Sequence, residues 1–289
     1  MTHTTAVTSV NGVMVAADTP AISPLDRGIT LGDGIFETVK VEHGDPWYLE
    51  RHVLRLEHAA AVMGIAVPPQ LRAWVAELLQ YPSAPTDRSL ALRITLTRGS
   101  TTTHGLAGTE PSAPTVICSL YAAPAFPAPV YEAGLSAHVA SAPRNERAFT
   151  AGIKTTSYAE SIFALREARA VGCDDAIFID THGAVAEGAA SNIFARLGDS
   201  LVTPPVGRGI LPGITRAVVL SLAHELGIPY EERSFSISDL LRAGEVLLTS
   251  SLRGIAPVVR IDGYPIGAGT PGTYTRQLMT AYATQPTRV

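Results

Sequence analysis

Several residue types that commonly indicate a protein's class are scarce in this sequence. Its 289 residues include two cysteines, Cys118 and Cys173, whose spacing fits neither a disulfide framework nor a metal site, so we expect a reducing compartment. Charged residues make up 17% of the chain, which excludes a disordered or highly charged tail protein. The formal net charge of −4 gives no electrostatic basis for binding nucleic acid or an anionic membrane.

Long apolar runs and targeting signals are also missing from the pattern. No uninterrupted apolar stretch reaches the ~18 residues that a membrane span needs. Residues 1–22 lack a basic region followed by an apolar core, which is the signature of a secretory signal. We therefore expect a cytoplasmic protein with no membrane contact. The chain has 289 residues, of which 46% are hydrophobic, and this length suits one large domain or two medium domains.

Lysine is the scarcer of the two strongly basic residues. Of 22 Lys and Arg side chains, only Lys40 and Lys154 are lysines. A coding bias toward arginine explains this ratio at most positions. Such a bias spares positions where arginine cannot replace lysine, because only lysine loses its proton readily enough to act as a nucleophile. Each lysine is therefore a candidate for chemistry.

The hydrophobic pattern predicts strands and helices in two parts, separated by residues 122–130, where three prolines indicate a linker without regular structure. The part at 1–121 has a hairpin at 6–16, strands at 34–41, 90–97 and 115–121, and helices at 49–63 and 71–81. The part at 131–289 has strands at 135–141, 175–180, 192–196, 201–203, 245–249 and 258–261, and helices at 157–171, 215–226, 238–243 and 272–283. We expect two α/β (α+β) domains.

Two charged residues lie among small and apolar neighbours. Lys154, in Gly-Ile-Lys-Thr-Thr-Ser-Tyr, has no acidic neighbour and is either an ordinary lysine at a strand end or an amine available for reaction. Glu187, in Val-Ala-Glu-Gly-Ala-Ala-Ser-Asn, needs a partner in such surroundings. That partner is either a structural cation or the protonated ring nitrogen of a pyridinium cofactor.

Three further segments have groups suited to a phosphate. Residues 211–216 (Leu-Pro-Gly-Ile-Thr-Arg) open a helix whose free backbone N–H groups, with a threonine hydroxyl, can cradle an anion. The hydroxyl cluster at 249–251 follows a strand, and Arg55 lies on a predicted helix, where arginine is by default a solvated surface group. An activated lysine, a carboxylate for a pyridinium and a phosphate site are together what pyridoxal 5′-phosphate requires.

The order of these segments resembles the class IV, fold-type IV aminotransferases over about residues 20–265. The landmarks are Asp-Arg-Gly at 26–28, Leu-Gly-Asp-Gly-Ile-Phe-Glu at 31–37, His-Val-Leu-Arg-Leu at 52–56, Lys154, Glu-Gly at 187–188, Ser-Asn-Ile-Phe at 191–194, Leu-Pro-Gly-Ile-Thr-Arg at 211–216, and Ser-Ser-Leu-Arg-Gly at 250–254 before Pro-Val at 257–258. The resemblance implies an N-terminal α/β sandwich, a C-terminal pseudo-barrel with the lysine, pyridoxal 5′-phosphate in the cleft between them, and a homodimer.

The same resemblance implies a role for each matching residue. Lys154 would form the Schiff base with the cofactor and move the α-proton of the substrate, and Glu187 would pair with the pyridine nitrogen. The phosphate would be bound by a set of groups on several segments: Arg55, Ile214, Thr215, Ser250 and Ser251. No metal is implied.

The substrate residues are less well defined. Phe36, Thr38 and Lys40 share one face of a strand that in the family faces the substrate, although Lys40 also suits a surface position. Arg93 matches a carboxylate-binding arginine of related enzymes, or is a charge at a strand edge. His104 is a possible donor in the loop at 98–106.

That loop lacks the Arg-X-His of the best-known D-amino-acid aminotransferases and the Arg-Gly-Leu or Arg-Gly-Tyr of aminodeoxychorismate lyases. Tyr158, four residues after the lysine, is closer to those two branches than to the branched-chain group, which typically has Gly-Asn-Tyr there. We therefore expect a transaminase acting on D-amino acids with a 2-oxo acid such as 2-oxoglutarate. The alternatives are 4-amino-4-deoxychorismate lyase and, third, a branched-chain amino-acid aminotransferase.

Overall fold

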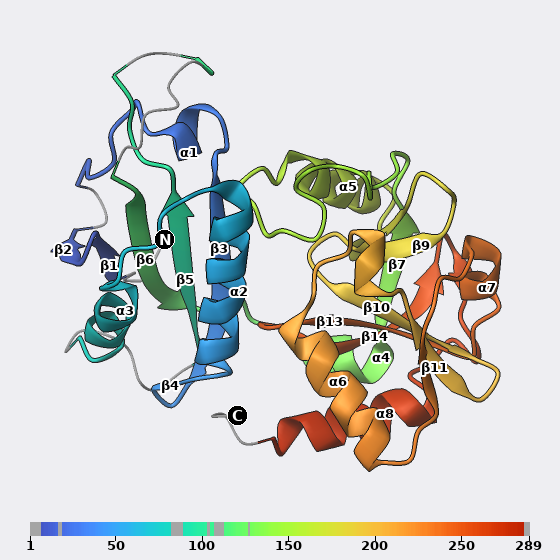
Figure 1. Cartoon of the computed structure of the whole chain (residues 1–289). Coiled ribbons are helices and arrows are strands. Elements are labelled where there is room, and N and C mark those ends of the chain that lie inside the picture. Colours follow the sequence, from blue (N-terminus) through green and yellow to red (C-terminus); the bar gives the residue numbers. More distant parts are fainter. Residues whose placement is uncertain are drawn as a thin grey trace. The chain divides into compact units, whose positions relative to one another are not determined.

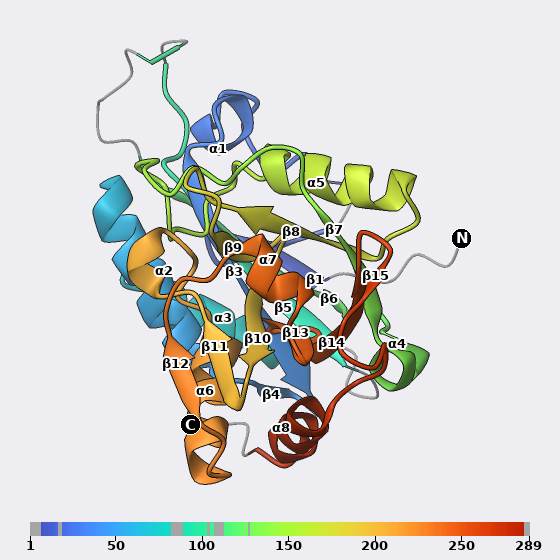
Figure 2. The same cartoon turned by 90° about the vertical axis from the view of Figure 1, so that its right-hand side faces the viewer.

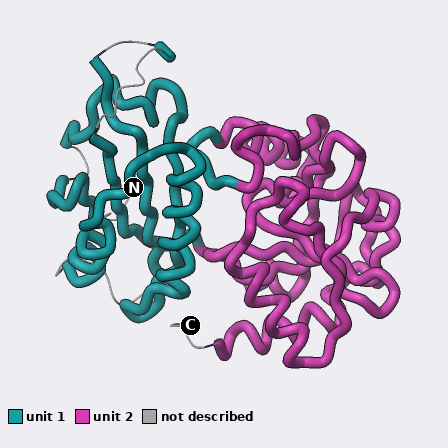
Figure 3. Tube along the Cα trace, in the orientation of Figure 1, with its two compact units in different colours: residues 1–124, 153–157, 286–289 teal, residues 125–152, 158–285 magenta. Residues whose placement is uncertain are grey.

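The computed structural model describes residues 7–16, 19–81, 89–102, 105–106, 113–126 and 128–285. The chain divides into two compact units, which Figure 3 shows in different colours. Unit 1 includes the chain up to Pro124 together with Ile153–Ser157, and unit 2 comprises Ala125–Gly152 and Tyr158–Gln285. The first division therefore falls within the predicted linker at 122–130.

The segment Ile153–Ser157, which contains Lys154, belongs to unit 1 and not to the predicted domain at 131–289. Its backbone pairs with the start of the strand β3 (Gly34–Glu42). The N–H of Phe36 donates to the carbonyl of Lys154 at 2.9 Å, and the N–H of Thr156 donates to the carbonyl of Gly34 at 2.8 Å. These bonds join the lysine to unit 1, although the residues on either side of the segment belong to unit 2.

Unit 1 is built on an antiparallel sheet with the strand order β2-β1-β6-β5-β3-β4 (Figure 1). The remaining strands are β1 (Val7–Val10), β2 (Val13–Val15), β4 (Asp45–Pro46), β5 (Leu90–Thr97) and β6 (Thr115–Ala122). The helices are α1 (Arg27–Thr30), α2 (Leu49–Met63) and α3 (Leu71–Leu79). The predicted hairpin, the three long strands and the two long helices are confirmed to within two residues at each end.

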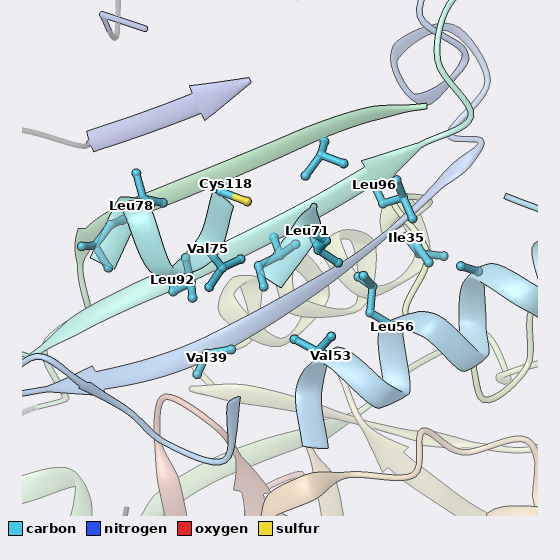
Figure 4. Close-up of a cluster of buried hydrophobic side chains, with 14 of the residues drawn as sticks. Ile35, Val39, Val53, Leu56, Leu71, Val75, Leu78, Leu92, Leu96 and Cys118 are labelled. Atoms are coloured by element: carbon cyan, nitrogen blue, oxygen red, sulfur yellow. The ribbon is translucent and has the colours of Figure 1, made fainter. Parts of the chain in front are cut away.

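The core of unit 1 lies between the sheet and the helices α2 and α3, as Figure 4 shows. Alternation along β3 buries Ile35 and Val39 on this face, where they meet Val53 and Leu56 of α2. Each such side chain contributes roughly 1.5–3 kcal/mol when fully buried. The opposite face of β3 has Phe36, Thr38 and Lys40, as the alternation predicts.

Unit 2 contains a mixed sheet with the order β12-β11-β10-β13-β14-β7-β8-β9, and β15 pairs with β14. The pairs β11–β12, β14–β7 and β7–β8 are parallel. The pairs β10–β11, β10–β13, β13–β14 and β8–β9 are antiparallel. The strands are β7 (Leu135–Val139), β8 (Asp175–Ile179), β9 (Val185–Gly188), β10 (Asn192–Leu197), β11 (Ser200–Thr203), β12 (Tyr230–Glu232), β13 (Glu245–Ser250), β14 (Gly254–Ile261) and β15 (Tyr264–Pro265).

Helices pack on this sheet in two groups. The helix α5 (Ala159–Ala170) runs beside β7 and β8, whereas α6 (Ile214–Glu225) and α8 (Thr273–Ala283) pack together on β13 (Figure 2). The shorter helices are α4 (Ala128–Ala133), the 3-10 helix η1 (Val206–Arg208) and α7 (Ile237–Leu241). In the described part of the chain, no helix combines the length and the apolar character that crossing a membrane requires.

The prediction that residues 122–130 contain no regular structure is wrong at both ends. Ala122 is the last residue of β6, and α4 already begins at Ala128. Pro129 lies in the first turn of α4, where a helix does not need the missing N–H, so the proline does not prevent the helix. Only residues 123–126 of the described part of this stretch lie outside helices and strands.

Candidate functional site

Lys154 lies at the edge of β3 with its side chain over an aromatic ring of the same unit. Its Nζ is 4.3 Å from the ring centroid of Phe36, and the residue is half-buried. The hydroxyl of Thr156 donates to the carbonyl of Gly32 at 2.9 Å and fixes the segment further. The backbone around the predicted nucleophile is therefore held by β3 and by the loop before it.

Arg93 lies on the neighbouring strand β5 and contacts the same ring. It pairs with Thr38 across β3 and β5, its Cζ is 3.7 Å from the ring centroid of Phe36, and its Nε donates to the Thr95 hydroxyl at 3.2 Å. The guanidinium of Arg93 and the amine of Lys154 therefore both contact the ring of Phe36. A guanidinium is a strong ligand for a carboxylate, so Arg93 can bind an acid group on the ring that Lys154 also contacts.

Lys40 has partners other than the ring of Phe36. The Nζ of Lys40 is 2.6 Å from Glu42 Oε1 and 4.6 Å from the ring centroid of Trp47. Its charge is thus already paired within the strand, and a substrate contact for Lys40 stays a prediction. His104 lies outside the described residues.

Arg55 of α2 is held by a buried carboxylate on the core face of β3. Its Nε and Nη2 donate to the two oxygens of Glu37 at 2.7 Å each. The Nδ1 of His52 lies 2.7 Å from Glu37 Oε2, and only 1% of Glu37 is exposed. Burial raises the pKa of Glu37, but the hydrogen bonds with His52 and Arg55 outweigh burial and bring this pKa to about 2.

The sequence-based prediction missed Glu37 as the shared partner of Arg55 and His52. Glu37 shares a strand face with Ile35, Val39 and Val41, and a carboxylate on a buried face requires a cation or a set of donors. That signal was available in the alternation of β3. Burial also lowers the pKa of His52, with further lowering by the charges of Arg55 and Lys154, against the raising effect of Glu37.

Glu187 lies on β9 in unit 2 with two partners of that unit. Its Oε2 accepts a hydrogen bond from the N–H of Leu211 at 3.1 Å, and its Oε1 is 3.6 Å from Nε of Arg144. The Arg144 guanidinium also lies 4.0 Å from the ring centroid of Phe178. The first interpretation of Glu187, a structural cation as partner, is supported by Arg144 beside it. The second interpretation, a cofactor ring nitrogen as partner, is consistent with the 13% of the side chain that is exposed.

The N-terminus of α6 has no side-chain cap. Gly213 precedes the helix, and the first backbone N–H groups have no partner within the helix. Ile214 and Thr215 are buried there. A Cβ on Gly213 would lie 1.8 Å from Asn192 Oδ1, which explains the glycine, and Asn192 Nδ2 donates to the carbonyl of Leu211 at 2.8 Å.

Hydroxyl groups lie on β13, which packs against α6, and in the turn before β10. Ser250 ends β13, Ser251 follows it, and both are half-buried. Within the described residues, the buried hydroxyls of Ser191 and Thr249 have no hydrogen-bond partner. Open donors and an uncapped helix N-terminus fit a phosphate group. No group of three His, Cys, Asp or Glu side chains in the described residues could hold a metal ion.

The chain matches the family described as Amino-transferase class IV over residues 34–261. It therefore belongs to the class IV aminotransferase family and is an enzyme of that class. It is 32% identical to a putative branched-chain-amino-acid aminotransferase of Methanocaldococcus jannaschii, over 93% of this chain and 92% of that protein. It is 31% identical to the D-alanine aminotransferase of Bacillus licheniformis over 94% of both chains, and 29% identical to the aminodeoxychorismate lyase of Bacillus subtilis over 94% and 92%.

Solved structures agree with this family and confirm the predicted fold. The branched-chain amino acid aminotransferase of Escherichia coli superposes with a TM-score of 0.88 at 26% identity, over 96% of this chain and 93% of that one. The 4-amino-4-deoxychorismate lyase of Pseudomonas aeruginosa gives 0.82 at 32% identity over 95% and 97%. The fold is thus a mixed α/β, fold-type IV structure with an antiparallel sheet and a curled half-barrel sheet.

The predicted cofactor is confirmed in the same way. Another branched-chain aminotransferase, which superposes with a TM-score of 0.88 at 25% identity over 96% and 92%, was solved with pyridoxamine 5′-phosphate. This compound is the amino form of pyridoxal 5′-phosphate. The protein is therefore a pyridoxal 5′-phosphate enzyme of the class IV family.

Proposed function

We propose that the protein is a pyridoxal 5′-phosphate-dependent transaminase that moves an amino group between a D-amino acid and a 2-oxo acid such as 2-oxoglutarate. The observation that carries the proposal is the pair Arg93 and Lys154 on the ring of Phe36. An α-amino acid has a carboxylate one bond from the carbon that reacts. Arg93 would bind this carboxylate, and Lys154, on the same ring, would act at the carbon that reacts.

Each part of the cofactor has a matching group in the chain. The uncapped first turn of α6 and the guanidinium of Arg55 suit the phosphate, and the Glu187 carboxylate suits a protonated ring nitrogen. When bound, the cofactor supplies an aldehyde carbon that accepts amino groups and an electron-withdrawing ring. One solved relative was obtained in two structures, with pyridoxamine 5′-phosphate and with N-(5′-phosphopyridoxyl)-L-glutamate, which supports this match.

The residues of the chain would then divide the work as follows. Arg93 orients the substrate through its α-carboxylate. Lys154 takes a proton from the α-carbon and returns it to another atom, because a neutral amine is a suitable general base. Glu187, fixed by Leu211 and Arg144, keeps a positive charge on the ring, and the ring withdraws electrons most strongly when it is charged.

The choice of D-amino acids is supported by the residues after the lysine. Thr155, Thr156, Ser157 and Tyr158 replace the Gly-Asn-Tyr that is typical of the branched-chain group. The D-alanine aminotransferase relative, at 31% identity, is consistent with this choice. The lyase and the branched-chain activities have relatives at similar identity, so both are included as rival outcomes of the test.

The test of the cofactor site uses the fact that the chain has two lysines. Protein loaded with pyridoxal 5′-phosphate and reduced with borohydride should carry the cofactor on Lys154, as located by peptide mass spectrometry. Lys154→Ala should lose the visible absorption band, whereas the matched variant Lys40→Ala should retain it. Labelling of Lys40, or an unchanged band in Lys154→Ala, would refute the assignment.

The test of the substrate follows the loaded cofactor band during single half-reactions. D-Alanine should bleach the band, and L-leucine should leave it in place. Bleaching by L-leucine alone would make the enzyme a branched-chain aminotransferase. Release of pyruvate from aminodeoxychorismate, with no bleaching by D-alanine, would make it a lyase.

The protein is also proposed to act as a homodimer, as the family resemblance implies. Exposed apolar side chains on unit 2 support an interface there, because Phe149 is 102% exposed and Ile162 and Phe163 of α5 are 54% and 63% exposed. Light scattering after size exclusion should give twice the mass of one chain. A single-chain mass at micromolar concentration would contradict the proposal.

A further inference from the structure

Thr249 belongs to the hydroxyl cluster at 249–251, but the resemblance assigns phosphate contacts only to Ser250 and Ser251 of that cluster. Thr249 lies on β13 and is 2% exposed. Within the described residues, its buried Oγ1 has no hydrogen-bond partner. Buried hydroxyls in folded proteins are nearly always paired, because an unpaired one forfeits its hydrogen bonds to water. The hydroxyl therefore requires an explanation.

The register of the sheet determines where this hydroxyl lies. Thr249 pairs directly with Asn192 across β13 and β10, so the two side chains emerge on the same face of the sheet. The Asn192 side chain on that face reaches Leu211 and lies against Gly213, directly before α6. The unpaired hydroxyl of Thr249 is thus on the side of the sheet where the N-terminus of α6 begins.

Two independent features therefore meet at one place in unit 2. The first is a twelve-residue helix whose N-terminus has no side-chain cap. The second is a fully buried hydroxyl on the adjoining strand that has a hydrogen bond to give. Both supply donors: the helix has no side-chain cap, and the hydroxyl has no hydrogen-bond partner among the described residues. An acceptor with several oxygens and a negative charge satisfies them together.

We infer that Thr249 is a further ligand of the phosphate of the bound cofactor, donating from Oγ1 beside the backbone N–H groups of the first turn of α6. The inference rests on the proposed function, because it assigns the phosphate of the cofactor to this helix. It extends the phosphate site to a residue inside the strand. Ser250 and Ser251 lie at and after the strand end, where both are half-buried.

The chain contains a matched control on the other side of β10. Thr203 of β11 is also fully buried, but its hydroxyl donates to the carbonyl of Ile193 at 2.8 Å. Replacing either threonine with valine keeps the shape and removes one hydroxyl. The two replacements should have opposite effects on the stability of the cofactor-free protein, because only Thr203 loses a bond that the folded chain makes.

The experiment measures binding and stability separately. Cofactor-free wild type, Thr249→Val, Thr249→Ser and Thr203→Val are titrated with pyridoxal 5′-phosphate and with pyridoxal, which has no phosphate. Thr249→Val should bind the phosphorylated cofactor about 10-fold or more weakly, with pyridoxal binding unchanged within about twofold. Thr249→Ser should restore the affinity, and Thr203→Val should leave it unchanged.

The melting temperatures of the cofactor-free proteins provide a readout that a structural role would not give. Thr249→Val should melt roughly 2 °C higher than wild type, and Thr203→Val should melt lower. Thr249→Ala lacks the same hydroxyl and must show the same selective loss of the phosphorylated cofactor. The higher melting temperature and the selective loss of the phosphorylated cofactor together distinguish a ligand from a structural hydroxyl.

The inference is overturned if Thr249→Val binds pyridoxal 5′-phosphate with the affinity of wild type. That result would mean that the hydroxyl of Thr249 donates only to water and not to the phosphate. The inference is also overturned if that variant loses pyridoxal and its phosphate ester equally, because the loss would then be structural. Failure of the proposed cofactor site looks different, because wild type itself would then not bind pyridoxal 5′-phosphate. A different substrate, as in the lyase, would leave the binding of the cofactor and the test of Thr249 intact.

Discussion

Removing the Glu37 carboxylate should destabilise unit 1 far more than removing a surface carboxylate. In Glu37→Gln, the amide keeps only one acceptor oxygen, so the largely buried guanidinium of Arg55 loses one of its two 2.7 Å bonds and the negative charge that balances its own. The pKa of Glu37 falls from 4.5 to about 2 on folding, so ionisation contributes about 3 kcal/mol to stability at neutral pH, at roughly 1.4 kcal/mol per unit. We expect a loss of about 3 kcal/mol at pH 7.

The pH dependence of this contribution has a definite sign. Because the folded pKa of Glu37 lies below the unfolded one, the stabilisation is complete above pH 4.5 and is lost as the pH falls toward about 2. Wild type should therefore lose stability steeply over this interval. Glu37→Gln should have a shallower slope there, because glutamine does not titrate.

The assay is urea unfolding followed by tryptophan fluorescence. Both tryptophans of the chain, Trp47 and Trp74, lie in unit 1, so this signal reports the unit that contains Glu37. The matched control is Glu50→Gln, whose carboxylate is 62% exposed and pairs with Arg72 at 2.6 Å. That surface pair should contribute less than about 1 kcal/mol. Equal losses in the two variants, or an unchanged acid slope in Glu37→Gln, would refute the reasoning.

Two further predictions concern the substrate and the anion site. Arg93→Gln should raise KM for amino acids about 10-fold or more at nearly constant kcat, because a charged hydrogen bond contributes roughly 1.5–3 kcal/mol. Lys40→Gln should change KM little, because the charge of Lys40 is paired with Glu42. Equal effects of the two variants on KM in steady-state kinetics would count against Arg93. Gly213→Ala should destabilise unit 2 by roughly 1–3 kcal/mol and weaken cofactor binding, because its Cβ would lie 1.8 Å from Asn192 Oδ1. In Gly207→Ala, where no atom lies within 4 Å of the new Cβ, thermal unfolding and cofactor titration should match wild type, and a similar result for Gly213→Ala would contradict the prediction.

Local patterns predicted the elements of unit 1 well. The helix α2 has its predicted bounds because the apolar period of 3.6 residues ends at Gly64, whose φ of 62° closes the helix. The two faces of β3 also follow directly from alternation. Such signals are contained within a few residues of the element itself.

The positions of the candidate site residues depend on contacts between residues that are distant in the sequence. No pattern in the sequence indicated that Ile153–Ser157 pairs with Gly34 and Phe36, because an edge pairing of a few residues leaves no periodic signal. Likewise, alternation put Glu37 on the core face, but only tertiary packing determines that His52 and Arg55 meet it. The linker prediction failed for the opposite reason: a proline in the first turn of a helix looks, in sequence, like a proline in a loop.

The attachment of Lys154 to β3 also determines how this protein can be made and divided. A fragment ending at Pro124 would contain most of unit 1 but not the lysine, and the edge of β3 from Gly34 to Phe36 would have no chain to pair with. During synthesis, this edge is completed only after the ribosome has translated the first helix and strand of unit 2, α4 and β7, and released residue 157. The amine of Lys154 thus reaches its position late, after the sheet that holds it has been synthesised.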